Sequence, residues 1–113
     1  MDKLKEKIKF LKKLIDISLL ESNWDSYGAE PVKSKVIKKS KKLGLKLINN
    51  DIDLFMSPGP NGEISIEFKI DNDYEFIIYE TKTIYLIYDI NNNVLEQNFL
   101  TKDILKNIIN KKN

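Results

Sequence analysis

Residues 63–70 read EISIEFKI, which is the clearest strand pattern in the chain. An isoleucine or phenylalanine alternates with a polar residue, and this alternation places all the apolar side chains on one face of a strand. A turn at residues 57–62 precedes it, because two prolines and two glycines do not fit inside a central strand. A second turn, Asp-Asn-Asp at residues 71–73, follows. The pattern predicts one strand of an antiparallel sheet with one buried face.

Further strands are predicted on both sides of this one, at residues 52–56, 74–79, 83–88 and 94–99. Short turns between successive strands favour a β-meander, in which sequence neighbours pair antiparallel. The strands 74–79 and 83–88 are apolar on both faces. Central strands covered on both sides have this pattern, and so do strands that offer an aromatic face to a partner. The sequence leaves both interpretations open.

Two amphipathic helices are predicted before the sheet. The first begins after Asp2 as its N-cap, and its stripe of apolar residues is expected to face the core: Leu4, Ile8, Leu11, Ile15 and Leu19, widened by Leu14 and Ile17. The second is predicted to begin at Pro31, which has no N–H to leave unpaired. We expect its inner side to consist of Val32, Val36, Ser40, Leu43 and Leu47.

These elements predict an α+β fold in a single domain covering residues 1–113. An N-terminal antiparallel helix pair packs on a four- to five-stranded antiparallel β-meander, and a C-terminal helix follows Thr101 as its N-cap. No apolar run approaches the ~20 residues of a membrane span, and no secretory signal pattern is present. We therefore expect a cytoplasmic protein that has no membrane partner.

The segment between the two N-terminal helices contains the only tryptophan of the chain. Its two polar side chains can bond to local backbone, and its glycine can adopt a positive φ that redirects the chain. Its two aromatic rings must either cover the helix ends and the sheet edge or be presented to a partner. We expect a structural loop with the tryptophan ring largely buried, although the sequence alone leaves the second possibility open. The loop residues are Asn23, Trp24, Asp25, Tyr27, Gly28 and Pro31.

Residues 23–31, NWDSYGAEP, resemble the NWDGYGA-x-P signature of small uncharacterised proteins found in bacteria and mobile elements. Residues 60–67, PNGEISIE, are similar to the P-x-G-G-[IV]-x-[LI]-E segment of the same family. Ser26 stands where the signature usually has glycine. The resemblance implies two helices joined by the signature and followed by a β-meander. It implies no assigned activity.

The chain has no histidine and no cysteine. Their absence excludes Ser-His-Asp and Cys-His catalysis and all imidazole or thiolate metal ligands. Residues 71–75 begin like a calcium-binding loop, but they are not followed by the glycine at position six or the glutamate at position twelve that such a loop needs. We therefore predict a protein that is not an enzyme and binds no metal or cofactor.

Charge is divided unevenly along the chain. Residues 1–50 have a net charge of +7 and residues 51–113 have −5, which together give the +2 of the whole chain. The first hypothesis is a protein-binding module that regulates or inhibits a larger, basic protein, such as a nucleic-acid-processing or defence enzyme. Antitoxins and phage anti-defence proteins, including CRISPR inhibitors, act in this way. The alternative is a nucleic-acid-binding accessory protein that uses the lysine-rich helix faces, which could also be merely solvated.

The first hypothesis places the partner on the strand half of the chain. Tyrosines supply rigid contact area with a polar tip, and acidic residues attract a basic protein. The candidate contact residues are Tyr74, Tyr79, Tyr85, Glu63, Glu67, Asp71 and Asp73, with Glu75 as a further acid. Ordinary packing of these tyrosines in the sheet, with their hydroxyl groups at its rim, is the alternative. The sequence does not distinguish a monomer from a dimer.

Overall fold

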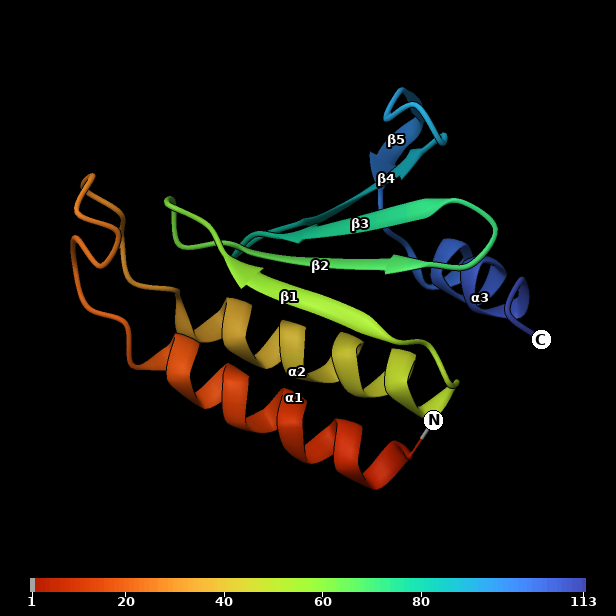
Figure 1. Ribbon diagram of the computed structural model, residues 1–113. Helices are drawn as coiled ribbons and strands as arrows, with labels where there is room; N and C mark the ends of the chain where they lie inside the picture. The colour runs from red at the N-terminus through yellow and green to blue at the C-terminus, as the bar shows by residue number, and fades with distance from the viewer. Residues whose placement is uncertain (1) are drawn as a thin grey trace.

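The computed structural model describes residues 2–113, which form two layers (Figure 1). A five-stranded sheet makes one layer, and helices pack against one face of it: α1 (Lys3–Ser18), α2 (Ser34–Asn49) and α3 (Lys102–Asn110). The helix pair, the meander and the last helix confirm the predicted α+β fold. None of the helices in this part of the chain is long and apolar enough to cross a membrane.

Five strands pair antiparallel in sequence order: β1 (Leu54–Pro58), β2 (Ile64–Lys69), β3 (Asp73–Ile78), β4 (Thr83–Tyr88) and β5 (Val94–Phe99). The predicted meander is therefore confirmed, and β4 and β5 have the expected bounds. Strand β1 begins two residues later than expected and ends on a proline. An edge strand tolerates this proline because its missing N–H removes no central ladder bond.

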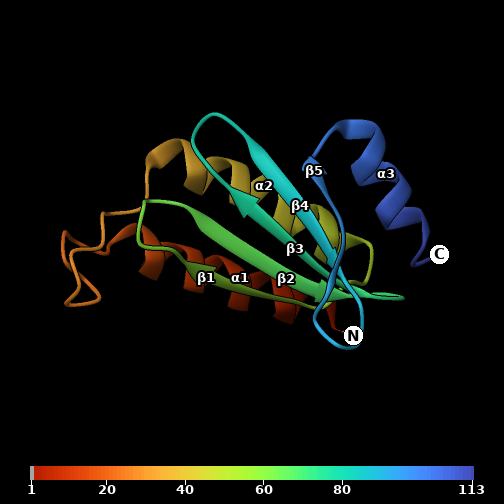
Figure 2. The same ribbon diagram turned by 90° about the horizontal axis from the view of Figure 1, so that it is seen from above.

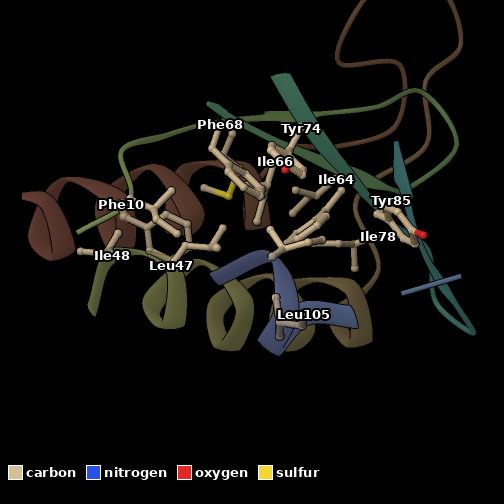
Figure 3. Packing of buried hydrophobic residues seen from close by; sticks show 14 of the residues in the cluster. Phe10, Leu47, Ile48, Ile64, Ile66, Phe68, Tyr74, Ile78, Tyr85 and Leu105 are labelled. Atoms are coloured by element: carbon tan, nitrogen blue, oxygen red, sulfur yellow. The ribbon is translucent and has the colours of Figure 1, made fainter. Parts of the chain in front are cut away.

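Alternate residues of the strands face the helices and form the core. Ile66 of β2 and Tyr85 of β4 point to this side, and they belong to one cluster with Phe10 of α1 and Leu47 of α2 (Figure 3). Leu105 of α3 belongs to the same cluster. One continuous hydrophobic core therefore joins the three helices to one face of the sheet, and within residues 2–113 no helix covers the other face.

Helix α1 turns a different side to the core from the one expected. Leu14 and Ile17 are buried as expected, and Phe10 is buried with them. The remaining members of the expected stripe are exposed, except Leu11, which is partly buried. The reason lies in α2, where a Cβ at Gly44 would overlap the Phe10 ring. Glycine at this position lets the two helices approach closely, and the phenylalanine fills the space. The predicted core stripe of Leu4, Ile8, Ile15 and Leu19 is therefore wrong.

Helix α2 buries the side that was expected, with Val32 just before it. It begins at Ser34 rather than at Pro31, because the preceding segment first runs beside the β1–β2 loop. There the Glu30 N–H donates to the Pro60 carbonyl at 2.9 Å. Both predicted N-caps are confirmed. The Asp2 carboxylate accepts from an N–H of α1, and the Thr101 hydroxyl accepts from an N–H of α3.

Candidate functional site

The face of the sheet that carries no helix is concave. In Figure 1 β4 and β5 rise out of the plane of the first three strands, away from the helices. Figure 2 shows the same strands from above. A trough of about 550 Å³ lies on this face. Residues from β1, β2, β3, β4 and the β4–β5 turn line it, so the trough spans the first four strands of the sheet.

The trough is acidic. Glu67 of β2 and Glu75 of β3 stand directly opposite each other in the register of the two strands, and Asp73 follows on the same face. Like charges directly opposite on paired strands are destabilising. Lys69 also lines the trough and pairs in register with Asp73, but none of these carboxylates forms an ion pair within residues 2–113. The trough therefore has an excess of uncompensated negative charge.

Hydroxyl groups fix the carboxylate of Glu75. The Ser65 hydroxyl donates to its Oε2 at 2.6 Å, and the Tyr88 hydroxyl donates to its Oε1 at 2.9 Å. At the β1 side, the Phe55 ring is more than half exposed, and the ammonium of Lys13 lies 4.1 Å from its centroid. An aromatic ring face attracts cations. The trough thus combines a held carboxylate, exposed carboxylates and aromatic rings, of which Phe55 already contacts one cationic side chain.

The chemistry of the trough must be judged from its own residues. Comparisons with protein-family models, with curated proteins and with solved structures found no match. In the part of the chain that the structure describes, no three acidic side chains are gathered to hold a metal ion. Carboxylates beside aromatic rings on a concave surface support recognition of lysine or arginine side chains.

Three tyrosines of the sheet have raised pKa values. Burial, the hydrogen bond to Glu75 and the charges of Glu75 and Glu67 raise the pKa of Tyr88 to about 12. Burial, followed by the bond to Asp71, raises the pKa of Tyr74. For Tyr85 the bond to Glu96 is the largest cause of the raised pKa, and burial adds to it. All three hydroxyl groups stay protonated in the folded protein beyond the usual tyrosine range.

We expect the protein to lose stability as the pH rises from about 10 to about 12. The unfolded chain releases tyrosine protons near pH 10, whereas folded Tyr88 keeps its proton up to about pH 12. Because the pKa of Tyr88 is higher in the folded protein than in the unfolded chain, its hydroxyl contributes stability that is fully present below pH 10. That stability is lost as the pH rises from about 10 to about 12. Urea unfolding at several pH values should show a smaller alkaline loss for Tyr88→Phe than for the unchanged protein. Equal alkaline losses in the two proteins would contradict this assignment.

Two of the tyrosines expected to contact a partner are core residues. Tyr74 is 1% exposed and stacks on Phe68 with ring centroids 5.2 Å apart, while the Tyr85 ring is buried on the same side of the sheet. Their hydroxyl groups reach acids at the rim, since Tyr74 donates to Asp71 at 2.6 Å and Tyr85 donates to Glu96. The hypothesis that these rings anchor a partner is corrected, because the helix layer covers them.

The other expected contact residues lie in different places. Glu67 and Asp73 line the trough, whereas Asp71 lies in the β2–β3 turn, where the ammonium of Lys111 approaches it at 3.9 Å. Tyr79 follows β3 and is half-buried beside a second hollow. Glu63 is buried and accepts from the Asn61 N–H at 3.0 Å, so its expected exposure is corrected.

Phe55 and Tyr88 are trough residues that the sequence did not single out as contacts. Phe55 lies in the edge strand β1, which the sequence predicts to begin two residues earlier than it does. Tyr88 is one of several tyrosines that the sequence does not distinguish. Strand alternation could have separated Tyr88 from Tyr85 and Tyr74. Tyr88 points to the face without a helix, whereas Tyr85 and Tyr74 point to the helices. Which face stays open depends on the helices, and a strand pattern does not contain that information.

The loop between α1 and α2 is built by its own polar groups. The Asn23 side chain accepts from the Gly28 N–H at 2.7 Å, and the Asp25 side chain accepts from the Tyr27 and Ala29 N–H groups at 2.8 and 3.0 Å. Gly28 has a φ of 86°, and Asn23 also has a positive φ, of 64°. These bonds hold a compact loop that projects beyond the ends of the helices (Figure 1).

The aromatic rings of this loop are not in the core. Trp24 is partly buried but lies outside the core cluster, and its indole N–H donates to the Glu30 carbonyl at 2.9 Å. The expected position between the helices and the sheet is therefore wrong. Tyr27 is 92% exposed at the loop. Pro31 lies in the extended segment before α2. The indole closes the loop on its own backbone, and the tyrosine is exposed to solvent.

Proposed function

We propose that this protein is a non-enzymatic binding module that holds a basic segment of a larger protein in the trough and thereby regulates or inhibits it. The opposition of Glu67 and Glu75 on a concave surface carries this proposal. A lysine or arginine side chain placed between the two carboxylates would relieve their repulsion and form charge-assisted hydrogen bonds. Phe55 and Tyr88 would add aromatic contact area beside it.

The proposed partner is a nucleic-acid-processing or defence enzyme. Such enzymes hold phosphates with lysine and arginine side chains, and an acidic trough would compete for the same side chains. Antitoxins and phage anti-defence proteins, including CRISPR inhibitors, are the functional class that fits this action. The two-layer arrangement supports it, because the acidic trough and the lysine-bearing outer sides of α1 and α2 lie on opposite layers of the molecule.

Charge reversal in the trough tests the proposal. We expect Glu67→Lys to weaken binding of a fluorescent arginine- and lysine-rich peptide at least about tenfold. Glu21→Lys is the matched control, because it makes the same change in net charge on the exposed loop after α1. Titration by fluorescence anisotropy at physiological salt should leave this control within about twofold of the unchanged protein. Equal losses in both variants would show general charge attraction and reject the trough as the site.

The alternative, nucleic-acid binding, rests on the exposed lysines of the helix layer, including Lys38, Lys41 and Lys42 on α2. Lys39 does not belong to this set, because its ammonium donates to the carbonyls of Tyr79 at 3.2 Å and Glu80 at 2.8 Å. Nucleic-acid binding that falls steeply with salt and is lost in Lys38→Glu with Lys42→Glu would favour the alternative. Mass spectrometry of proteins that co-purify from the native host would identify a partner of the trough.

A further inference from the structure

Helix α1 carries a second apolar stripe on the side that points away from the core. The four side chains that are between 46% and 71% exposed are Leu4, Ile8, Ile15 and Leu19, and Leu11 lies at the border, partly buried. Steps of four, three, four and four residues keep them on one side of a helix with 3.6 residues per turn. No element within residues 2–113 covers this stripe, and Figure 1 shows α1 at the outer side of the helix layer.

The stripe has the pattern of a coiled-coil seam. Ile8 and Ile15 occupy successive a positions of a heptad repeat, and Leu4 and Leu11 occupy the d positions. The last d position is Ser18, and Leu19 follows it at an e position. A narrow a/d stripe is the seam of a helix pair, whereas helices that lie on membranes present a broader apolar face, often with aromatic residues. Phe10, the only aromatic residue of α1, points into the core instead.

The surface beside the stripe is hollowed at one end. A hollow of about 240 Å³ lies against Leu4 and Ile8, where the helix begins after Asp2. In a helix pair, a side chain from one helix inserts between side chains of the other. The hollow therefore offers a place for an apolar side chain of a second helix.

Lysines flank the stripe on both sides. Lys5 and Lys12 occupy e positions and Lys7 a g position of the same heptad, and none of the three forms an ion pair with residues 2–113. In a coiled coil these positions face the corresponding positions of the partner helix. A second copy of this chain would bring lysines against lysines in either orientation. A helix with glutamate at these positions would instead form attractive pairs.

We infer that this stripe is a docking surface for an acidic amphipathic helix of another protein. The surface uses residues different from those of the trough, and it lies on the other layer of the molecule. Both can be occupied at once, and neither depends on the other. Helix α1 has 16 residues, which corresponds to a length of about 24 Å, sufficient for a short helix pair.

Two synthetic peptides of three heptads, both with isoleucine at a and leucine at d, test this inference. One has glutamate at e and g, and the other has lysine there. We expect the whole protein to bind the glutamate peptide at least about tenfold more tightly than the lysine peptide, measured by fluorescence anisotropy. Ile8→Gln combined with Ile15→Gln should weaken binding of the glutamate peptide by at least about tenfold. Both side chains are exposed, so the variant keeps its fold.

A charge swap makes the test specific. Lys5→Glu combined with Lys12→Glu should reverse the preference between the peptides, while Lys38→Glu combined with Lys42→Glu on α2 should leave it unchanged. An unreversed preference would overturn the inference. A dimer in gel filtration that Ile8→Gln with Ile15→Gln converts to a monomer would make a second copy the occupant and overturn it too. The same follows if this variant abolishes binding to vesicles of phosphatidylserine and phosphatidylcholine, because a membrane would then be the occupant.

Discussion

Replacing Leu14 with alanine should lower the free energy of unfolding by about 3 kcal/mol, whereas Ile15→Ala should change it by less than about 0.5 kcal/mol. The two residues are neighbours in α1 and have side chains of similar size. Leu14 is 4% exposed within the core, and Ile15 is 58% exposed on the second apolar stripe, which points away from the core. The alanine at residue 14 leaves a cavity, while the alanine at residue 15 removes methyl groups that already contact water.

Urea unfolding of both variants, followed by far-ultraviolet circular dichroism, measures the two free energies directly. Alanine is the most favourable helix residue, so helix propensity does not account for a loss at residue 14. Similar losses at both residues would mean that the outer stripe of α1 is also packed in the isolated protein. That result would contradict the structure and would remove the basis for a docking surface on this helix.

The sheet could be predicted from the sequence because its strands carry an unambiguous period. Residues 63–70 alternate apolar and polar side chains, and short polar turns separate the strands that follow. Such local patterns determine which residues form strands and which neighbours pair. The same local chemistry placed Thr101 as a cap, and the structure shows its hydroxyl accepting from the Ile104 N–H at 3.2 Å.

The inner side of α1 could not be predicted because this helix has apolar residues on two sides. A stripe through Leu4 and Ile15 and a stripe through Phe10 and Leu14 both have helical spacing. The choice between them is made by Gly44, some thirty residues later in the chain. Periodicity within one helix contains no information about the partner helix against which it packs.

The residues that line the trough are determined by packing between elements that are far apart in the sequence. Glu67 and Asp73 could be proposed as contacts from their charge and position, but Tyr74 and Tyr85 were proposed with them. Tyrosine is suited both to interfaces and to cores whose hydroxyl groups reach a polar rim. Whether a given tyrosine is a core residue or an interface residue depends on which face of the sheet the helices cover. Similarly, a loop that bonds to its own backbone leaves Tyr27 exposed, where a sequence-based expectation favoured burial of the rings.

The second large effect is expected where α1 and α2 touch. Gly44→Val should lower the free energy of unfolding by about 3 kcal/mol, because the new side chain would occupy the space of the Phe10 ring. Phe10→Ala alone should cost about 3–5 kcal/mol, since it removes a buried ring and leaves a cavity. Lys42→Val on the exposed side of α2 is the control, and it should cost under about 0.7 kcal/mol, the helix-propensity difference alone.

The double variant Phe10→Ala with Gly44→Val distinguishes a specific contact from general disruption. The valine would fill part of the cavity that the missing ring leaves, so the combined loss should be smaller than the sum of the two single losses by about 1–3 kcal/mol. Chemical denaturation of the four proteins in this cycle gives the coupling energy. Additive losses would show that residues 10 and 44 act independently, and the close approach of α1 to α2 would then not be what turns Phe10 inward and leaves the Leu4–Ile15 side of the helix free.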